Sequence, residues 1–145
     1  MALGAAAIGT GSAQAQPEVT LPSNAAVGAF DPAADTPVEV PRGSPLRKTL
    51  FDILRPRVEE QAAAKILFEG RLTACRNWAF FLGRTMGADG RKVTLSDMGN
   101  DDTVALWLRT RDGWTLVDFD AGGSDAFYTE WSQQYGAPAA LFLAQ

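Results

Sequence analysis

The spacing of apolar residues changes at Lys65, and this change limits the possible folds more than any other feature of the chain. Before Lys65, one apolar stripe recurs at helical spacing, formed by Leu46, Leu50, Ile53, Leu54 and Val58. After Lys65, apolar and polar residues alternate, which is typical of strands that bury one face. We therefore expect one helix before Lys65 and strands after it.

The expected helix has a clear start and an internal obstacle. Ser44 is a preferred N-cap residue, and proline, here Pro45, is preferred at the first helical position. Pro56 interrupts the stripe, because its ring would clash with the carbonyl group of Asp52. We expect a kink or a break at Pro56.

The charges of this helix run against the helix dipole. Arg47 and Lys48 lie in its first turns, and Glu59 and Glu60 lie late. The apolar stripe must therefore hold the helix by packing. Arg42 joins Arg47 and Lys48 in a small basic cluster, for which a solvated face is favoured over a site for an acidic lipid or polymer.

The rest of the chain predicts strands and a second helix. The strands are expected at 65–74, 78–82, 103–110 and 114–119. A turn at Asn77 should connect the first two strands, and a turn at Asp112-Gly113 should connect the last two. A long loop should connect the second strand to the third, and a short strand at 93–95 is an alternative within it. A last helix is expected from Ser124 to just before Gly136, and Pro138 should stop it. The order predicts an α+β fold in which an N-terminal helix packs on an antiparallel sheet of about four strands and a short C-terminal helix follows.

The N-terminal third differs in composition. Residues 1–15 are uncharged, rich in Ala and Gly, and end in Ala13-Gln14-Ala15, a pattern that resembles a signal peptide with its cleavage site. Residues 16–44 hold five of the eight prolines and predict a linker or a surface arm without regular structure. Residues 45–145 are expected to form a single α+β domain. The expected location is periplasmic or secreted, and no stretch predicts a membrane span.

Missing residue types exclude several chemistries. The chain has no histidine and one cysteine, Cys75, so histidine-dependent catalytic triads, multi-ligand Cys/His zinc sites and an intramolecular disulfide are excluded. The net charge of −4 makes nucleic acid an unfavourable partner. Any catalysis would depend on carboxylates, Lys, Tyr or Arg.

Three stretches carry a resemblance: LRKTLFDILRPRVE from Leu46, NWAFF from Asn77, and the closing DGWTLVDFDAGGSDAFYTEWSQQYGAPAALF. With them, the chain resembles a group of uncharacterised small exported proteins of proteobacteria. The resemblance implies an exported α+β domain, and no established activity accompanies the group. The element order is also similar to cystatin-like folds, in which a helix packs on a curved antiparallel sheet, although an analogy of fold carries little information about function.

Acidic residues near the end of the last strand are the candidate catalytic groups. Asp118 and Asp120 should share one face of the strand, and with Glu130 they could form an acid/base site. Asp118 to Asp125 could also bind Ca²⁺, but the spacing does not fit an EF-hand loop. A glycine turn that leads into a capped helix is favoured, so neither a metal nor a cofactor is expected.

Aromatic residues are the candidate binding groups. Phe127, Trp131 and Tyr135 form a stripe at spacing i, i+4 and i+8, which could bind a ligand but more often packs a terminal helix. Trp107 should face away from the core if Val104, Leu106 and Leu108 are buried. We therefore expect an exported, non-catalytic domain that binds a protein partner or small ligand through a sheet face or the terminal aromatic helix. The alternative is a small histidine-independent enzyme that uses Asp118, Asp120 or Glu130.

Overall fold

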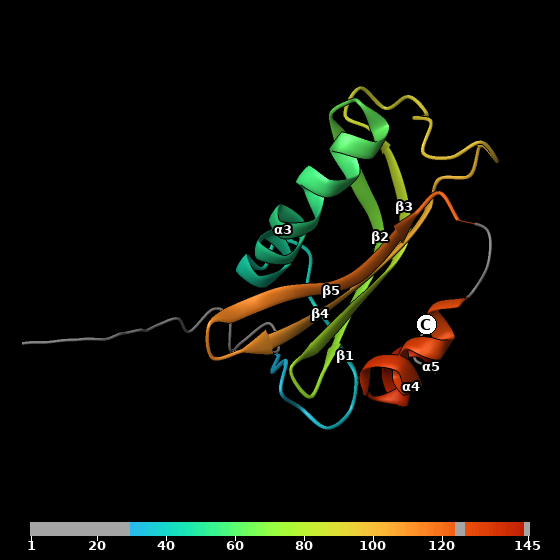
Figure 1. Ribbon diagram of the computed structural model, residues 1–145. Helices are drawn as coiled ribbons and strands as arrows, with labels where there is room; N and C mark the ends of the chain where they lie inside the picture. The colour runs from blue at the N-terminus through green and yellow to red at the C-terminus, as the bar shows by residue number, and fades with distance from the viewer. Residues whose placement is uncertain (1–29, 124–126, 144–145) are drawn as a thin grey trace, which may run out of the picture. The chain divides into compact units, whose positions relative to one another are not determined.

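Five strands form one antiparallel sheet in the order β1-β2-β3-β4-β5 (Figure 1). The computed structural model describes residues 30–123 and 127–143, with the backbone alone at Phe127, so the signal-like segment 1–15 and residues 16–29 of the Pro-rich segment lie outside the described residues. The strands are β1 (Val38–Glu39), β2 (Ile66–Cys75), β3 (Trp78–Gly87), β4 (Asp102–Thr110) and β5 (Gly113–Ala121). The helices are α3 (Pro45–Ala62), η2 (Phe127–Glu130), α4 (Trp131–Tyr135) and α5 (Ala139–Leu143). The α+β class is confirmed, and the sheet has five strands where about four were expected.

The additional strand, β1, lies within the Pro-rich segment. Val38 and Glu39 pair with β2, and the N–H of the buried Val40 donates to the Leu72 carbonyl at 2.8 Å. Proline is tolerated beside this strand because β1 lies at the edge of the sheet, where a missing N–H leaves no ladder bond unmade. The expectation of no regular structure before Ser44 is therefore wrong at β1.

Helix α3 begins as the sequence predicts and continues past the proline. The Ser44 hydroxyl accepts a hydrogen bond from the Arg47 N–H at 3.1 Å, and Pro45 is the first helical residue. The helix runs through Pro56 to Ala62, so the expectation of a break at Pro56 is wrong. Leu54 and Val58, on either side of the proline, are both buried, and their packing offsets the lost backbone hydrogen bond.

Two tight turns build the hairpins. Arg76 and Asn77 have φ values of 51° and 66° between β2 and β3, the left-handed conformation that matches the twist of a two-residue hairpin. The β4–β5 turn is centred on Arg111 and Asp112, and Thr110 pairs with Gly113. Both hairpins were expected, but the second turn lies one residue earlier than the expected Asp112-Gly113, because Gly113 already pairs as the first residue of β5. The loop 88–101 contains no strand, although one was considered at 93–95.

The C-terminal part is more broken than expected. One helix from Ser124 was expected, but the described residues form η2, α4 and α5, and Ser124 itself lies outside them. Gly136 ends α4 with a φ of 81°, a left-handed conformation that glycine adopts without strain. Pro138 then precedes the start of α5.

The sheet lies between α3 and the terminal helices (Figure 1). The terminal helices pack on one face, where a buried cluster joins Cys75, Phe80, Val104, Leu106, Trp131, Ala137, Leu141 and Phe142. On the other face, the Phe51 ring of α3 contacts the rings of Phe68, Phe81 and Trp107. Helix α3 also contacts both β2 and β5, the strands near the two sides of the sheet, so it packs at the sheet edges as well as on the face.

Candidate functional site

Asp118 and Asp120 lie on the sheet face that carries the terminal helices. In the β4–β5 register they oppose Leu106 and Val104, both members of the buried cluster on that face. The register shift of this strand pair falls between Leu106 and Trp107, beyond both carboxylates. The two aspartates therefore share one face, as their spacing requires.

The Asp118 carboxylate attaches the last helices to the sheet. The Tyr135 hydroxyl donates to Asp118 Oδ2 at 2.5 Å, and the N–H of Phe119 donates to Asp118 Oδ1 at 2.8 Å. The bond to Asp118 raises the pKa of Tyr135, because the neutral phenol is the donor. Both Asp118 oxygens therefore accept hydrogen bonds from the protein, and the bond to Tyr135 connects β5 to α4.

Asp120 supports the glycine turn that follows β5. Burial raises the pKa of its carboxyl, the nearby Asp118 raises it further, and a hydrogen bond from the Gly123 N–H opposes both effects. A Cβ atom at position 123 would collide with this carboxylate, so a larger residue there would require the Asp120 side chain to move. Glu130 lies exposed at the end of η2. Within residues 30–123 and 127–143, no group of three or more Cys, Asp or Glu side chains is placed to hold a metal ion.

The aromatic candidates divide between core and surface. Trp107 and Trp131 are fully buried, Trp107 beside Phe51 of α3 and Trp131 beside Phe80. Trp107 is not exposed because the sheet is covered on both faces, whereas the sequence argument assumed one covered face. Tyr135 is half-buried, and the Phe127 side chain lies outside the description. The two tryptophans thus offer no surface to a ligand in this structure.

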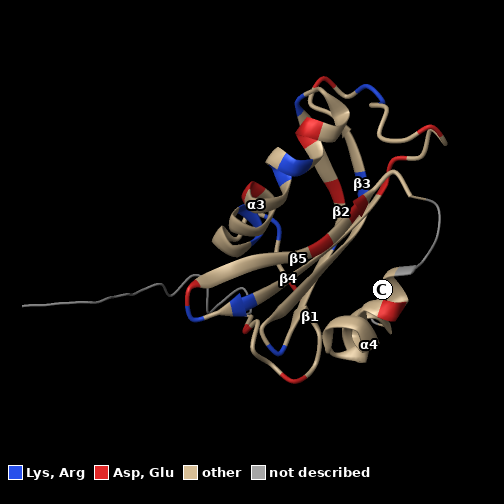
Figure 2. Cartoon of the chain, in the orientation of Figure 1, with Lys and Arg blue, Asp and Glu red and all other residues tan. Residues whose placement is uncertain are grey.

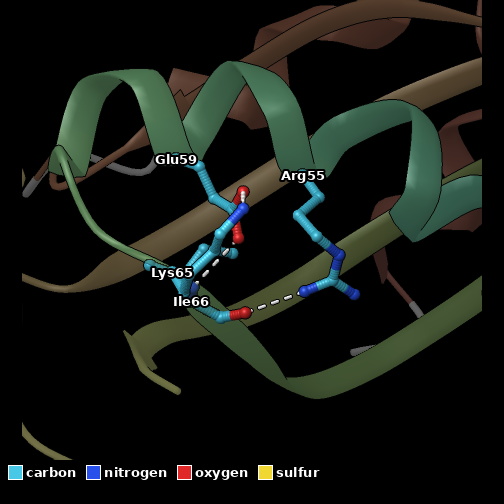
Figure 3. A network of polar contacts seen from close by, with 4 residues as sticks. All are labelled: Arg55, Glu59, Lys65 and Ile66. Atoms are coloured by element: carbon cyan, nitrogen blue, oxygen red, sulfur yellow. Dashed lines mark hydrogen bonds and ion pairs between the residues drawn. The ribbon is translucent and has the colours of Figure 1, made fainter. Parts of the chain in front are cut away.

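The arginines of α3, which sequence reasoning did not single out for this role, cover the edge of β2. Arg47 Nη2 donates to the Gly70 carbonyl at 3.1 Å, and Arg55 Nη1 donates to the Ile66 carbonyl at 2.8 Å. Figure 3 shows Arg55 on one side of Ile66 and Glu59 on the other, where Glu59 accepts from the Ile66 N–H at 3.2 Å. The signal was present in the sequence: Arg47, Phe51, Arg55 and Glu59 recur every four residues and form a second helical stripe.

Four of the side chains along this edge form a continuous stack. The Arg47 guanidinium lies 4.9 Å from the Phe51 ring centroid, the Phe51 and Phe68 centroids are 5.0 Å apart, and the Arg55 guanidinium lies 5.5 Å from the Phe68 centroid. We call this set the arginine–phenylalanine stack. Cations over aromatic faces are attracted by the ring quadrupole, most strongly where water is excluded. The stack therefore joins α3 to β2 without a carboxylate.

The start of α3 borders an open cavity of about 490 Å³. Its lining residues are Gly43, Ser44, Pro45, Arg47, Lys48, Phe51, Asp52 and Arg55. Burial lowers the pKa of Arg47, and the nearby Arg42 lowers it further, while Glu39 acts in the opposite direction. Figure 2 shows the basic residues along α3.

A second exposed surface lies on the sheet face that the terminal helices only partly cover. Leu67, Glu69 and Arg84 are exposed there, and Glu69 Oε1 lies 3.2 Å from Arg84 Nε. Cross-strand register places Arg84 opposite Glu69 on one side and Asp102 on the other. We call the exposed side chains Leu67, Glu69, Arg71, Arg84 and Asp102, with the half-buried Leu82 and Met86, the open strip.

Comparison with known proteins gives no relative. No protein family, curated protein or solved structure matches the chain. Among the described residues, no helix is both long and apolar enough to cross a membrane.

Proposed function

We propose that this chain is an exported, non-catalytic domain that binds a protein partner through the open strip. The observation that carries the proposal is the uneven cover of the sheet. The described terminal helices pack around Phe80 and Leu106, while Leu67 remains 46% exposed among charged neighbours. Leu67 lies opposite Met86, and an apolar centre with a polar rim is typical of protein interfaces.

The charges of the open strip favour a partner of mixed charge. Glu69, Arg84 and Asp102 alternate in sign across three neighbouring strands. A partner with the opposite alternation would gain complementary contacts and would be aligned by them, whereas a strongly acidic or basic partner would meet like charges.

The contacts of the carboxylates favour binding over catalysis. Asp118 uses its two oxygens to bind Tyr135 and the Phe119 N–H, and Asp120 accepts from the Gly123 N–H. These contacts give both aspartates a structural role. The alternative, a small enzyme that uses Asp118, Asp120 or Glu130, would need a carboxylate free to exchange a proton with a substrate.

Export is part of the proposal and depends on residues 1–15. The Ala13-Gln14-Ala15 pattern predicts cleavage after Ala15. Mass spectrometry of the protein from the periplasm or medium should find an N-terminus at Gln16. Exported protein that retains Met1 would contradict the cleavage.

Site-specific photo-crosslinking tests the binding surface. A photoreactive phenylalanine analogue at position 67 should give a discrete crosslinked product in cells that express the full chain, and Arg84→Glu should reduce that product at least threefold. The control is the same analogue at Met98, an exposed loop residue that should give no such product. A product obtained only from position 143, on α5, would reject the open strip in favour of the terminal helices, and equal products at all positions would indicate collision without a site.

A further inference from the structure

The open cavity at the start of α3 is lined by a largely buried arginine, Arg47, that has hydrogen-bond donors available to a ligand. The Arg47 residue is 8% exposed, and within the described residues its guanidinium makes one hydrogen bond, to the Gly70 carbonyl. Guanidinium carries five N–H donors. None of the other Arg47 nitrogens is both buried and without a partner among the described residues, so these donors reach the solvent of the open cavity that Arg47 lines, where a ligand oxygen can replace water as their acceptor.

The cavity has more positive than negative lining groups. Arg47, Lys48 and Arg55 line it together with one carboxylate, Asp52, and Lys48 Nζ already lies 2.5 Å from Asp52 Oδ2. No carboxylate among the described residues lies within ion-pair distance of Arg47 or Arg55. The two arginines are therefore attached to carbonyl groups and rings, and neither forms an ion pair with a described carboxylate.

Apolar groups lie beside these charges. The Phe51 ring and the Pro45 ring line the same cavity, and Phe51 lies in the arginine–phenylalanine stack between the two guanidinium groups. Ligand cavities of similar size typically combine an apolar lining with a few polar groups that orient the ligand. A bare inorganic ion would use the charge but would not use the apolar lining.

We propose that this cavity binds a small organic anion, in which a phosphate or carboxylate group pairs with Arg47 and an apolar body lies against Phe51 and Pro45. The guanidinium fork suits either oxyanion, because both can accept two parallel N–H bonds. Lys48 adds a second positive charge at the mouth of the cavity, where its side chain is 78% exposed. This site is separate from the open strip and does not depend on the proposed partner.

Titration of the full chain with four probes tests the proposal. Phenyl phosphate and benzoate carry an oxyanion on an aromatic body, inorganic phosphate lacks the body, and benzyl alcohol lacks the charge. Isothermal calorimetry or amide chemical shifts should show the tighter of the two aromatic anions binding with a Kd of about 1 mM or below, the range open to so small a ligand. Inorganic phosphate and benzyl alcohol should each bind at least fivefold more weakly, and the ranking of phenyl phosphate against benzoate identifies the oxyanion.

Three variants locate the binding. Arg47→Met should weaken the best probe at least tenfold, and Lys48→Met should weaken it about threefold without loss of the fold, since Lys48 is exposed. Arg57→Met is the matched control, because Arg57 lies on the same helix but stacks on Phe119 and does not line the cavity. If no probe binds below about 10 mM, or if Arg57→Met and Lys48→Met weaken binding equally, the proposal is wrong.

Discussion

The two edges of the sheet are covered in different ways, although α3 contacts both. Along β2, α3 supplies charged side chains: Arg47 and Arg55 donate to outward carbonyl groups, and Glu59 accepts from the Ile66 N–H. The end of β2 near Cys75 is covered by β1. The β2 edge is thus occupied along most of its length.

Among the described residues, the hydrogen bonds that cover the β5 edge lie near its C-terminal end. The Gly122 N–H donates to the Asp102 carbonyl, so Gly122 directs its backbone groups toward β4. Because this direction alternates along a strand, Phe119 and Ala121 direct their N–H and C=O groups away from β4. Asp118 accepts from the Phe119 N–H, and Gln61 of α3 donates to the Ala121 carbonyl at 2.7 Å. On the side away from β4, the first half of β5, from Gly113 to Leu116, has no strand beside it within the described residues.

The difference shows two solutions to one problem. An open edge presents unpaired N–H and C=O groups to any extended chain that approaches. The β2 edge uses hydrogen bonds from charged side chains, while the β5 edge uses neutral or local partners and a register shift opposite Leu106 and Trp107 that disturbs regular pairing.

Loosening α3 should weaken both edges together. Leu50 is fully buried, and Leu50→Ala should lower the free energy of unfolding by about 2–5 kcal/mol, measured by denaturant titration. Hydrogen exchange should accelerate at both Ile66 and Ala121. The control Leu143→Ala, at a position 83% exposed, should change stability by less than about 0.5 kcal/mol. A loss below about 1 kcal/mol at Leu50 would show that α3 is peripheral.

Separating β2 from β3 should affect the β2 edge first. Gly70 has a φ of 154°, and a Cβ atom there would lie within 2.4 Å of the Gly83 Cα. Gly70→Ala should therefore cost about 2–4 kcal/mol through backbone strain and overpacking. Gly90→Ala is the control for strain alone, because a Cβ at Gly90 meets nothing within 4 Å. Equal losses in the two variants would rule out the close strand contact as the cause.

Single side-chain changes should separate the two edges. Arg55→Met removes a charged donor and should cost about 1.5–3 kcal/mol, whereas Gln61→Ala removes neutral hydrogen bonds and should cost about 0.5–1.5 kcal/mol. Amide exchange should accelerate mainly on β2 in the first variant and at the end of β5 in the second. If both variants accelerated the same amides, the two edges would not be independent.

The smallest effect concerns pH. Burial raises the pKa of Asp120 above its ordinary value of 3.8, so its stabilising contribution is complete below that pH and is lost as pH rises through the folded-state pKa. Asn at position 120 does not titrate, so the Asp120→Asn variant should not lose this stability as the pH rises. The free energy of unfolding of the variant, relative to that of the unaltered protein, should therefore increase between pH 3 and pH 7. Asp112→Asn, at the exposed hairpin tip, is the control for the loss of one negative charge.

The sequence predicts those elements of the fold that depend on local patterns. The N-cap at Ser44, the change of period at Lys65 and the turn before Gly113 each reflect a preference of a few adjacent residues. Strand β1 could not be predicted in this way, because its two residues are ordered by pairing with Ala74 and Thr73, far along the chain.

The candidate sites show the same limit more strongly. Alternation along a strand is enough to place Asp118 and Asp120 on one face. It cannot show that Trp107 is covered by α3, or that Arg47 lies over Phe51 and donates to Gly70, because these contacts depend on how helix and sheet dock. The sequence does show that the positive charge of Arg47 lies in the first turn of α3, where the helix dipole disfavours it. The hydrogen bond of Arg47 to the Gly70 carbonyl of β2 offsets this unfavourable interaction.

The bonds that α3 makes to the two edges differ in the length of chain they close, and this has a consequence for folding. Both hairpins are local and can form early, but Arg47 and Gly70 are 23 residues apart and Gln61 and Ala121 are 60 residues apart. Contacts of greater sequence separation form more slowly because they close longer loops. The β2 edge is therefore protected first, and the β5 edge stays open longer. During synthesis, β5 is the strand through which two nascent copies of this chain would aggregate.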